Sequence, residues 1–152
     1  MSLKDRVSDD IKAAMKAKDK VRLETVRSIK KVILEKETLV RPSGQDQLTP
    51  EQELEVLTQL AKQRKDSVEQ YQKAGRDDLA AQEAQELEIL SEYLPQQLSD
   101  AEIEAVIDDL MAKTGATSAK DMGKVMGPAM QQLKGRADGG KVQALVKAKL
   151  GS

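Results

Sequence analysis

The segment from Gly135 to Lys141 comes closer than any other part of this sequence to a motif with known chemistry. Its residues fit the first seven positions of the phosphate-cradling loop GxxxxGK(S/T). The eighth position is Val142, which has no hydroxyl group to place on Mg²⁺, and a helix rather than a strand is expected before the motif. The sequence therefore predicts a corner between two helices, where Gly135 ends the first and Asp138 caps the second.

A weaker interaction with phosphate at this corner stays open. The N-terminus of a helix presents free N–H groups and a partial positive charge, and Lys134, Arg136 and Lys141 lie near it in sequence. These features suit the phosphate of an RNA. Asp138 acts against them, because a capping carboxylate already accepts hydrogen bonds from the same N–H groups.

Basic residues recur along the C-terminal segment, since residues 113–152 contain eight basic and two acidic residues. Such a face would bind phosphates in a salt-dependent manner without reading bases. With two tyrosines as the only aromatic residues, the chain suits a folded RNA better than stacked single strands. The predicted tRNA-binding residues are Lys120, Lys124, Lys134, Arg136, Lys141 and Lys147. The alternative is that these residues are ordinary solvated cations that balance the acidic segment 83–112.

Other reactive side chains are scarce. The sequence has no cysteine and no histidine, which removes the best thiol nucleophile, the commonest general base and the usual zinc ligands. We therefore expect no catalytic residue, no metal site and no cofactor. The N-terminus is charged from its first turn, and no apolar run approaches the roughly 20 residues of a membrane helix. A cytoplasmic protein that does not enter a membrane is the expectation.

Helical periodicity runs through the chain and predicts an all-α fold, because apolar residues recur every three or four positions. About four helices, arranged as two hairpins, are expected in an N-terminal domain of residues 1–94. Their predicted starts are marked by capping residues: Ser2 with Asp5, Asp19, Thr49 with Gln52, and Asp77.

The loop Pro95–Leu98 is the predicted boundary, and a small three-helix domain is expected at residues 99–152. Its helices are predicted to start at Ser99, at Ser118 with Asp121, and at Asp138. Pro128 removes a hydrogen bond inside the middle helix and should kink it near Lys124. Close packing against another backbone is predicted at four glycines: Gly123, Gly127, Gly135 and Gly139.

Positive charge is also concentrated at the start of the chain, where residues 1–36 hold eleven basic and six acidic residues. Helical spacing scatters the basic side chains around the helix axes, so we expect solvent to surround most of them: Lys12, Lys16, Lys18, Lys20, Arg22, Arg27, Lys30 and Lys31. The sequence also allows an intramolecular attraction between this basic pair of helices and four carboxylates, Glu83, Glu86, Glu88 and Glu92. Exposed pairs of this kind add little stability.

Several short motifs follow one another along nearly the whole chain. They are Met15–Lys20, Lys62–Ser67, Ala74–Leu79, Glu86–Leu90, Tyr93–Leu98, Lys120–Gly127 and Lys134–Gly139. In this combination and order the sequence resembles the bacterial YqeY (GatB/YqeY-like) family. The resemblance implies an N-terminal helical domain and a small three-helix domain. It also implies kinship of the C-terminal part with the tail domain of the tRNA-dependent amidotransferase B subunit, a tail that contacts tRNA.

Three functions are therefore considered. The first is a non-catalytic accessory protein that binds tRNA, or a tRNA-dependent enzyme, through the C-terminal domain. The second is a protein–protein adaptor without RNA binding. The third is an amidotransferase-related component, whose carbon–nitrogen ligase activity with glutamine as amido-N donor would be implied only by the resemblance. The sequence does not predict an oligomeric state.

Overall fold

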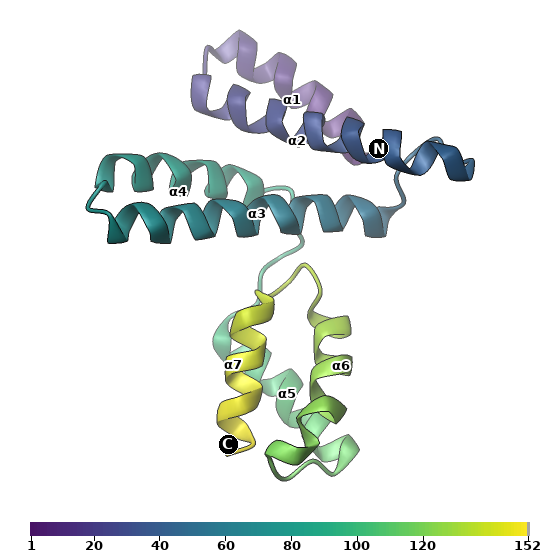
Figure 1. The fold of residues 1–152 in the computed structure, drawn as a ribbon. Coiled ribbons are helices and arrows are strands. Elements are labelled where there is room, and N and C mark those ends of the chain that lie inside the picture. The colour runs from purple at the N-terminus through teal and green to yellow at the C-terminus, as the bar shows by residue number, and fades with distance from the viewer. Residues whose placement is uncertain (152) are drawn as a thin grey trace. The chain divides into compact units, whose positions relative to one another are not determined.

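The computed structural model describes residues 1–151, and this part of the chain is all-α, as the periodicity predicts. Figure 1 shows its seven α-helices, and no strand occurs among the described residues. The chain divides into two compact units, Met1–Leu94 and Pro95–Ser152. Each unit has its own aliphatic core, so each is described by itself.

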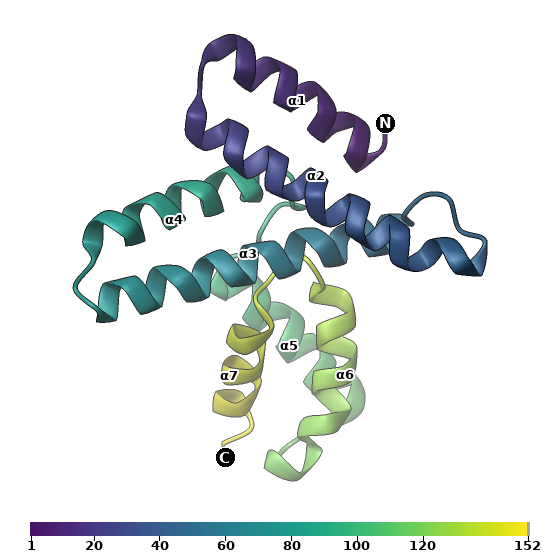
Figure 2. The ribbon, with the colours of Figure 1, turned by 45° about the horizontal axis from the view of Figure 1, so that its top comes forward.

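The first unit consists of two antiparallel helical hairpins, which Figures 1 and 2 both show. Its helices are α1 (Leu3–Ala17), α2 (Lys20–Val40), α3 (Pro50–Lys73) and α4 (Asp77–Ser91). Contacts of α2 with both α3 and α4 join the hairpins. The core at this junction includes Val7, Val26, Ile29, Ile33, Val56, Leu57, Leu60 and Leu90.

Three of the predicted helix starts in this unit are confirmed by their caps. The Ser2 hydroxyl accepts from the N–H of Asp5, and the Asp19 carboxylate accepts from the N–H of Arg22, each at 3.1 Å. Thr49 forms a capping box with Gln52. The Thr49 hydroxyl accepts from the N–H of Gln52, and the Gln52 side-chain oxygen accepts from the N–H of Thr49. These caps depend on neighbours within one turn, which explains why local sequence was sufficient to locate them.

The predicted cap at Asp77 is wrong. Helix α4 begins at Asp77 itself, its N-cap is Arg76, and no side chain caps it. Gly75 has a φ of +73°, a left-handed conformation that lets the chain reverse and re-enter a helix after a single further residue. Asp77 is therefore already inside the first turn. Its negative charge still interacts favourably with the partial positive charge at the N-terminus of the helix.

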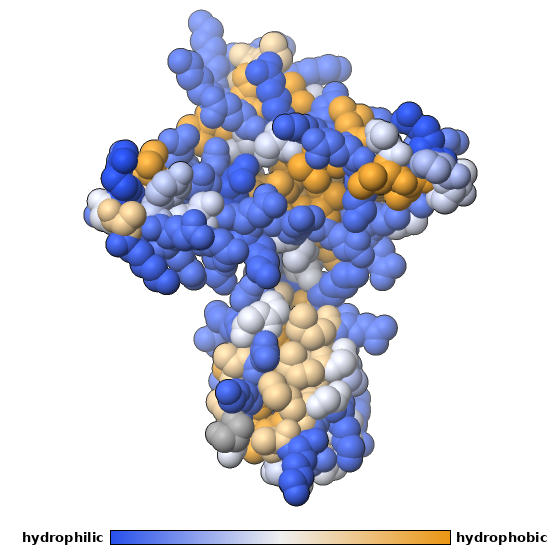
Figure 3. All heavy atoms as spheres, viewed as in Figure 1, coloured by the Kyte–Doolittle hydropathy of each residue, from blue (hydrophilic) through white to orange (hydrophobic). Residues whose placement is uncertain are grey.

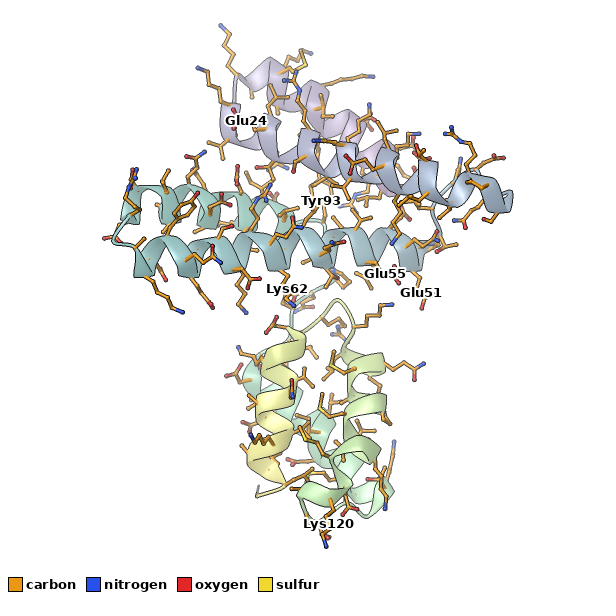
Figure 4. The ribbon with its side chains drawn as sticks, viewed as in Figure 1. Glu24, Glu51, Glu55, Lys62, Tyr93 and Lys120 are labelled. Carbon is orange, nitrogen blue, oxygen red and sulfur yellow. The ribbon has the colours of Figure 1, made fainter. Side chains whose placement is uncertain are left out.

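Tyr93, just beyond α4, ties the two hairpins together, and Figure 4 shows it between them. Its side chain is only 5% exposed, and its hydroxyl donates to the Asp10 carboxylate of α1. The Arg6 guanidinium lies 5.0 Å from the ring centroid. Arg22 of α2 pairs with Glu92 at 2.7 Å and with Asp10 at 3.7 Å. Burial first, and then the Asp10 carboxylate, raise the pKa of Tyr93 well above its usual range.

The second unit is a three-helix group built from α5 (Asp100–Thr114), α6 (Met122–Leu133) and α7 (Gly139–Lys149). Helix α5 contacts both α6 and α7, and those two also contact each other. The shared core includes Ile103, Ile107, Leu110, Val125, Ala129, Leu133, Val142, Val146 and Leu150. The predicted cap at Ser99 is confirmed, because its hydroxyl accepts from the N–H of Glu102 at 3.2 Å.

The predicted start of α6 after a cap at Ser118 is wrong by three residues. Ser118 instead precedes a 3₁₀ turn over Ala119–Asp121, and α6 begins at Met122. The Asp121 carboxylate accepts from the N–H of Thr117 at 3.1 Å, so it points back along the chain. The capping box expected from these residues therefore does not form, and the carboxylate instead closes the tight turn before the helix.

We predict that Tyr93→Phe lowers the free energy of unfolding by about 1–2 kcal/mol, because it removes a hydrogen bond to a carboxylate and leaves Asp10 less well satisfied. Urea unfolding followed by circular dichroism would measure the change. Tyr71→Phe is the matched control, since half-buried Tyr71 makes no side-chain hydrogen bond among residues 1–151. Equal stability of the two variants would show that the Tyr93 hydroxyl contributes nothing beyond packing.

Candidate nucleic-acid interface

The corner between α6 and α7 has the conformation that the sequence predicts. Helix α6 ends at Leu133, and Gly135 follows with a φ of +76°. The Asp138 carboxylate caps α7 by accepting from the N–H of Lys141 at 3.1 Å. The corner is therefore a helix–turn–helix connection in which one of the free N–H groups is already occupied.

Hydrogen bonds from the segment before α5 hold this corner in place. The Gln97 amide donates to the Gly135 carbonyl at 2.7 Å, and the N–H of Leu98 donates to the Arg136 carbonyl at 2.9 Å. The Arg136 Nε donates in turn to the Gln96 carbonyl at 3.4 Å. Because the backbone is held at Gly135 and at Arg136, the exposed side chains of Lys134 and Arg136 project from a fixed turn.

Lys141, the third cation predicted at this corner, is engaged within its own unit. Its ammonium lies 2.6 Å from the Asp100 carboxylate at the start of α5. That hydrogen bond, supported by the Asp100 and Asp138 charges, raises the pKa of Lys141. The corner therefore combines the cations Lys134, Arg136 and Lys141 with two carboxylates, and it has less excess positive charge than the sequence suggests.

Lys120 and Lys124 lie at the other end of α6, as the label on Lys120 in Figure 4 shows. Lys124 lies in the first turn of α6, nine residues before Leu133, which corresponds to about 14 Å at 1.5 Å per residue. Lys120 lies in the 3₁₀ turn that precedes the helix. Lys124 is 3.4 Å from Asp121, whose pKa is lowered first by the Thr117 N–H and then by this lysine. The structure therefore does not bring the predicted cations together on one site.

Lys147, the last predicted residue, lies in the final turn of α7. Its neighbour Lys149 pairs with Asp108 at 2.9 Å, which raises the pKa of that lysine. On α5 itself, Lys113 pairs with Asp109 at 3.0 Å. Carboxylates of α5 thus neutralise several C-terminal lysines, as the alternative of charge balance anticipated.

The predicted close packing fails at Gly123 and Gly127. Both glycines are exposed, and a Cβ at either would meet nothing within 4 Å. The reason is that α6 buries the opposite side, through Val125 and Ala129. At Gly139 a Cβ would lie 2.9 Å from the Met130 Cε, which is the end of a flexible side chain and not another backbone. Gly135 is buried, and its positive φ gives a separate reason for glycine.

Gly127 has a local explanation instead, because it precedes Pro128 inside α6. Proline disfavours the helical conformation of the residue before it, partly through a clash with that residue's Cβ. Glycine has no Cβ, so the chain can continue as a helix through this pair. A packing role was inferred from the spacing, while the neighbouring proline was the more informative signal.

The sequence analysis noted the basic residues of the N-terminal hairpin but did not predict a binding surface there. Arg22 pairs with Glu92, but the other basic residues singled out there form no ion pair anywhere in residues 1–151: Lys12, Lys16, Lys18, Lys20, Arg27, Lys30 and Lys31. Of the predicted attractions to Glu83, Glu86, Glu88 and Glu92, only the pair Arg22–Glu92 forms. The spacing of the basic residues relative to Met15 and Leu34, two exposed apolar residues, was the signal available in the sequence.

The described residues hold no group of three or more acidic side chains placed to bind a metal ion. None of their helices is both long enough and apolar enough to cross a membrane.

Comparison with known proteins identifies a family. The family model for Yqey-like proteins matches residues 4–150. Curated relatives bear the name altered inheritance of mitochondria protein 41, mitochondrial. The protein from Vanderwaltozyma polyspora is 35% identical over 74% of this chain and 63% of its own length. Those from Lachancea thermotolerans and Saccharomyces cerevisiae are 36% and 31% identical over 68% and 70% of this chain. The match spans 55% and 59% of their lengths, so each of the three relatives extends well beyond it.

We predict that the effect of Gly127→Ala on stability depends on Pro128. With alanine at position 128, Gly127→Ala should raise the free energy of unfolding by about 0.5–1 kcal/mol, because alanine favours the helix. With Pro128 present, the gain should vanish or reverse through the clash with the proline ring. A double-mutant cycle by urea unfolding measures the coupling. The same gain in both backgrounds would contradict this explanation.

Proposed function

This chain belongs to the Yqey-like protein family, and from that premise we propose that it is a non-catalytic accessory protein that binds tRNA, or an enzyme bound to tRNA, through its C-terminal unit. The resemblance of that unit to the tRNA-contacting tail of the amidotransferase B subunit supports the proposal. So does the absence of cysteine and histidine from the sequence, which leaves few groups for catalysis.

The observation that carries the proposal is the fixed turn at the α6–α7 corner. Lys134 and Arg136 flank Gly135 there, and both side chains are exposed. The hydrogen bonds from Gln97 and Leu98 order the backbone before any ligand arrives. A preordered pair of cations loses less entropy on binding phosphate than the same two residues on a mobile loop would lose.

The corner suits recognition by shape and charge. Residues 95–152 contain no aromatic residue, so this unit has no aromatic ring on which bases could stack. The same segment contains eight basic and seven acidic residues, which makes the long-range attraction for RNA weak. Binding should therefore be local and should involve about two phosphates. That number corresponds to a slope near −2 when the logarithm of the affinity is plotted against that of salt concentration.

We predict that the purified chain binds tRNA with micromolar affinity in low salt and that Lys134→Glu together with Arg136→Glu strongly weakens this binding. The cause is replacement of two phosphate contacts by repulsion, which should cost at least about tenfold in affinity. Fluorescence anisotropy with labelled tRNA would measure it. Lys113→Glu is the control, because exposed Lys113 lies on α5 in the same unit. Unchanged binding in the double variant would refute the site, and no binding in low salt would refute the tRNA role.

A protein–protein adaptor is the second candidate. It is favoured by the pairing of Lys141 and Lys149 with carboxylates of α5, since this pairing reduces the charge available to RNA. Partners that are retained on the immobilised chain after nuclease treatment would support the adaptor. Partners that are lost with the RNA would support the tRNA-associated role.

A further inference from the structure

An open groove runs along the α1–α2 hairpin of the first unit. Its volume is about 440 Å³, and its lining residues are Ile11, Arg27, Lys30, Lys31, Leu34, Glu35 and Thr38. The residues from α2 recur at intervals of three or four, so they occupy one face of that helix. Figure 2 shows the two helices side by side, and each contributes to the groove.

The groove has an apolar floor. Ile11 of α1 is half-buried, and Leu34 of α2 is 44% exposed. The apolar surface continues along α1, because Met15 lies one turn beyond Ile11 and is 54% exposed. Figure 3 shows such apolar side chains among charged ones over this hairpin. Apolar surface rimmed by polar groups is typical of a surface that binds another molecule.

The rim of the groove is positively charged. Arg27, Lys30 and Lys31 line it, and Lys12 and Lys16 line a second hollow around Met15. None of these five cations forms an ion pair with another described residue, and Glu35 is the single acidic residue in the lining. This arrangement contrasts with that of the lysines on α7, which find carboxylates within their own unit.

We propose that this groove binds an acidic amphipathic helix of a partner protein. Such a helix would place apolar residues, spaced three or four apart, on Ile11, Leu34 and Met15, and its carboxylates would face the cationic rim. The apolar floor favours a polypeptide over RNA. The phosphates of an RNA would pair with the basic residues of the rim, but the apolar residues of the floor would remain exposed to water. The floor also offers no aromatic ring on which a base could stack.

The partner helix comes from a different protein. The acidic helices of this chain already bury their apolar sides: α4 through Ala80 and Leu90, and α5 through Ile103, Ile107 and Leu110. A second copy therefore has no acidic amphipathic helix to offer. The groove lies in the first unit and the tRNA corner in the second, so this role is independent of tRNA binding.

A synthetic peptide tests the groove directly. The probe is a fluorescent helical peptide of about 18 residues with leucines on one face and glutamates on both flanks. A second peptide has the same composition, with the leucines scattered around the helix. Titration of the full chain into each peptide should show saturable binding of the first and at least tenfold weaker binding of the second. Equal binding of both peptides would overturn the proposal, because it would show attraction by charge alone.

Variants of the full chain locate the site. Leu34→Gln and Lys31→Glu alter exposed side chains and should each weaken binding of the amphipathic peptide about tenfold. Lys62→Glu on α3 is the control for Lys31→Glu, since Lys62 is also exposed and without an ion pair among the residues described. Unfolding by urea establishes that the variants remain folded.

The outcomes distinguish the groove from the tRNA corner. Peptide binding that survives both groove substitutions would overturn the proposal. A second outcome would also overturn it: the amphipathic peptide does not bind the unmodified chain, and Lys31→Glu weakens the binding of labelled tRNA. The groove would then be a surface for RNA. The Lys134→Glu, Arg136→Glu double variant should bind the peptide normally, so failure at one surface leaves the other testable.

Discussion

The hydrogen bond from the Tyr93 hydroxyl to the Asp10 carboxylate is the contact on which the first unit depends most. It joins the residue that follows α4 to the middle of α1, two elements that are far apart in the sequence. Arg22 extends the connection to α2 by pairing with Asp10 and Glu92. Aliphatic packing alone would hold the hairpins together without fixing their register, because it has no direction. The polar cluster supplies that direction, because its hydrogen bond and ion pairs join specific residues of α1, α2 and the segment after α4.

The distribution of charge in the fold differs from its distribution along the sequence. The basic segment at the C-terminal end forms pairs with α5, as Lys141 and Lys149 show. Exposed pairs of this kind contribute little to stability, but they reduce the local positive potential. In the first hairpin Lys4, Arg22 and Lys36 form ion pairs, whereas Arg27, Lys30 and Lys31 form none with the described residues. The cations without ion pairs therefore lie on a hairpin whose sequence contains several acidic residues as well.

Sequence reasoning succeeded where the interactions are local. The caps at Ser2, Thr49 and Asp138 and the all-α fold follow from patterns within a few residues. It failed where a partner is distant, as for Lys141, which pairs with a residue in another helix. The groove was also beyond reach, because Ile11 and Leu34 become neighbours only when α1 packs on α2. At Gly127 the spacing of glycines was given more weight than the adjacent proline.

The hydrogen bonds of Gln97 and Leu98 to the α6–α7 corner have a consequence for how this unit could be inherited or engineered. The residues that look like a tether between the units are part of the second unit's structure, so a transplantable version must begin at Pro95. If the second unit were fused to a different protein with those residues included, it would retain the hydrogen bonds that hold its α6–α7 corner. It would then need few contacts with the fusion partner. Gene fusion could move such a cassette between unrelated chains without redesign of the junction.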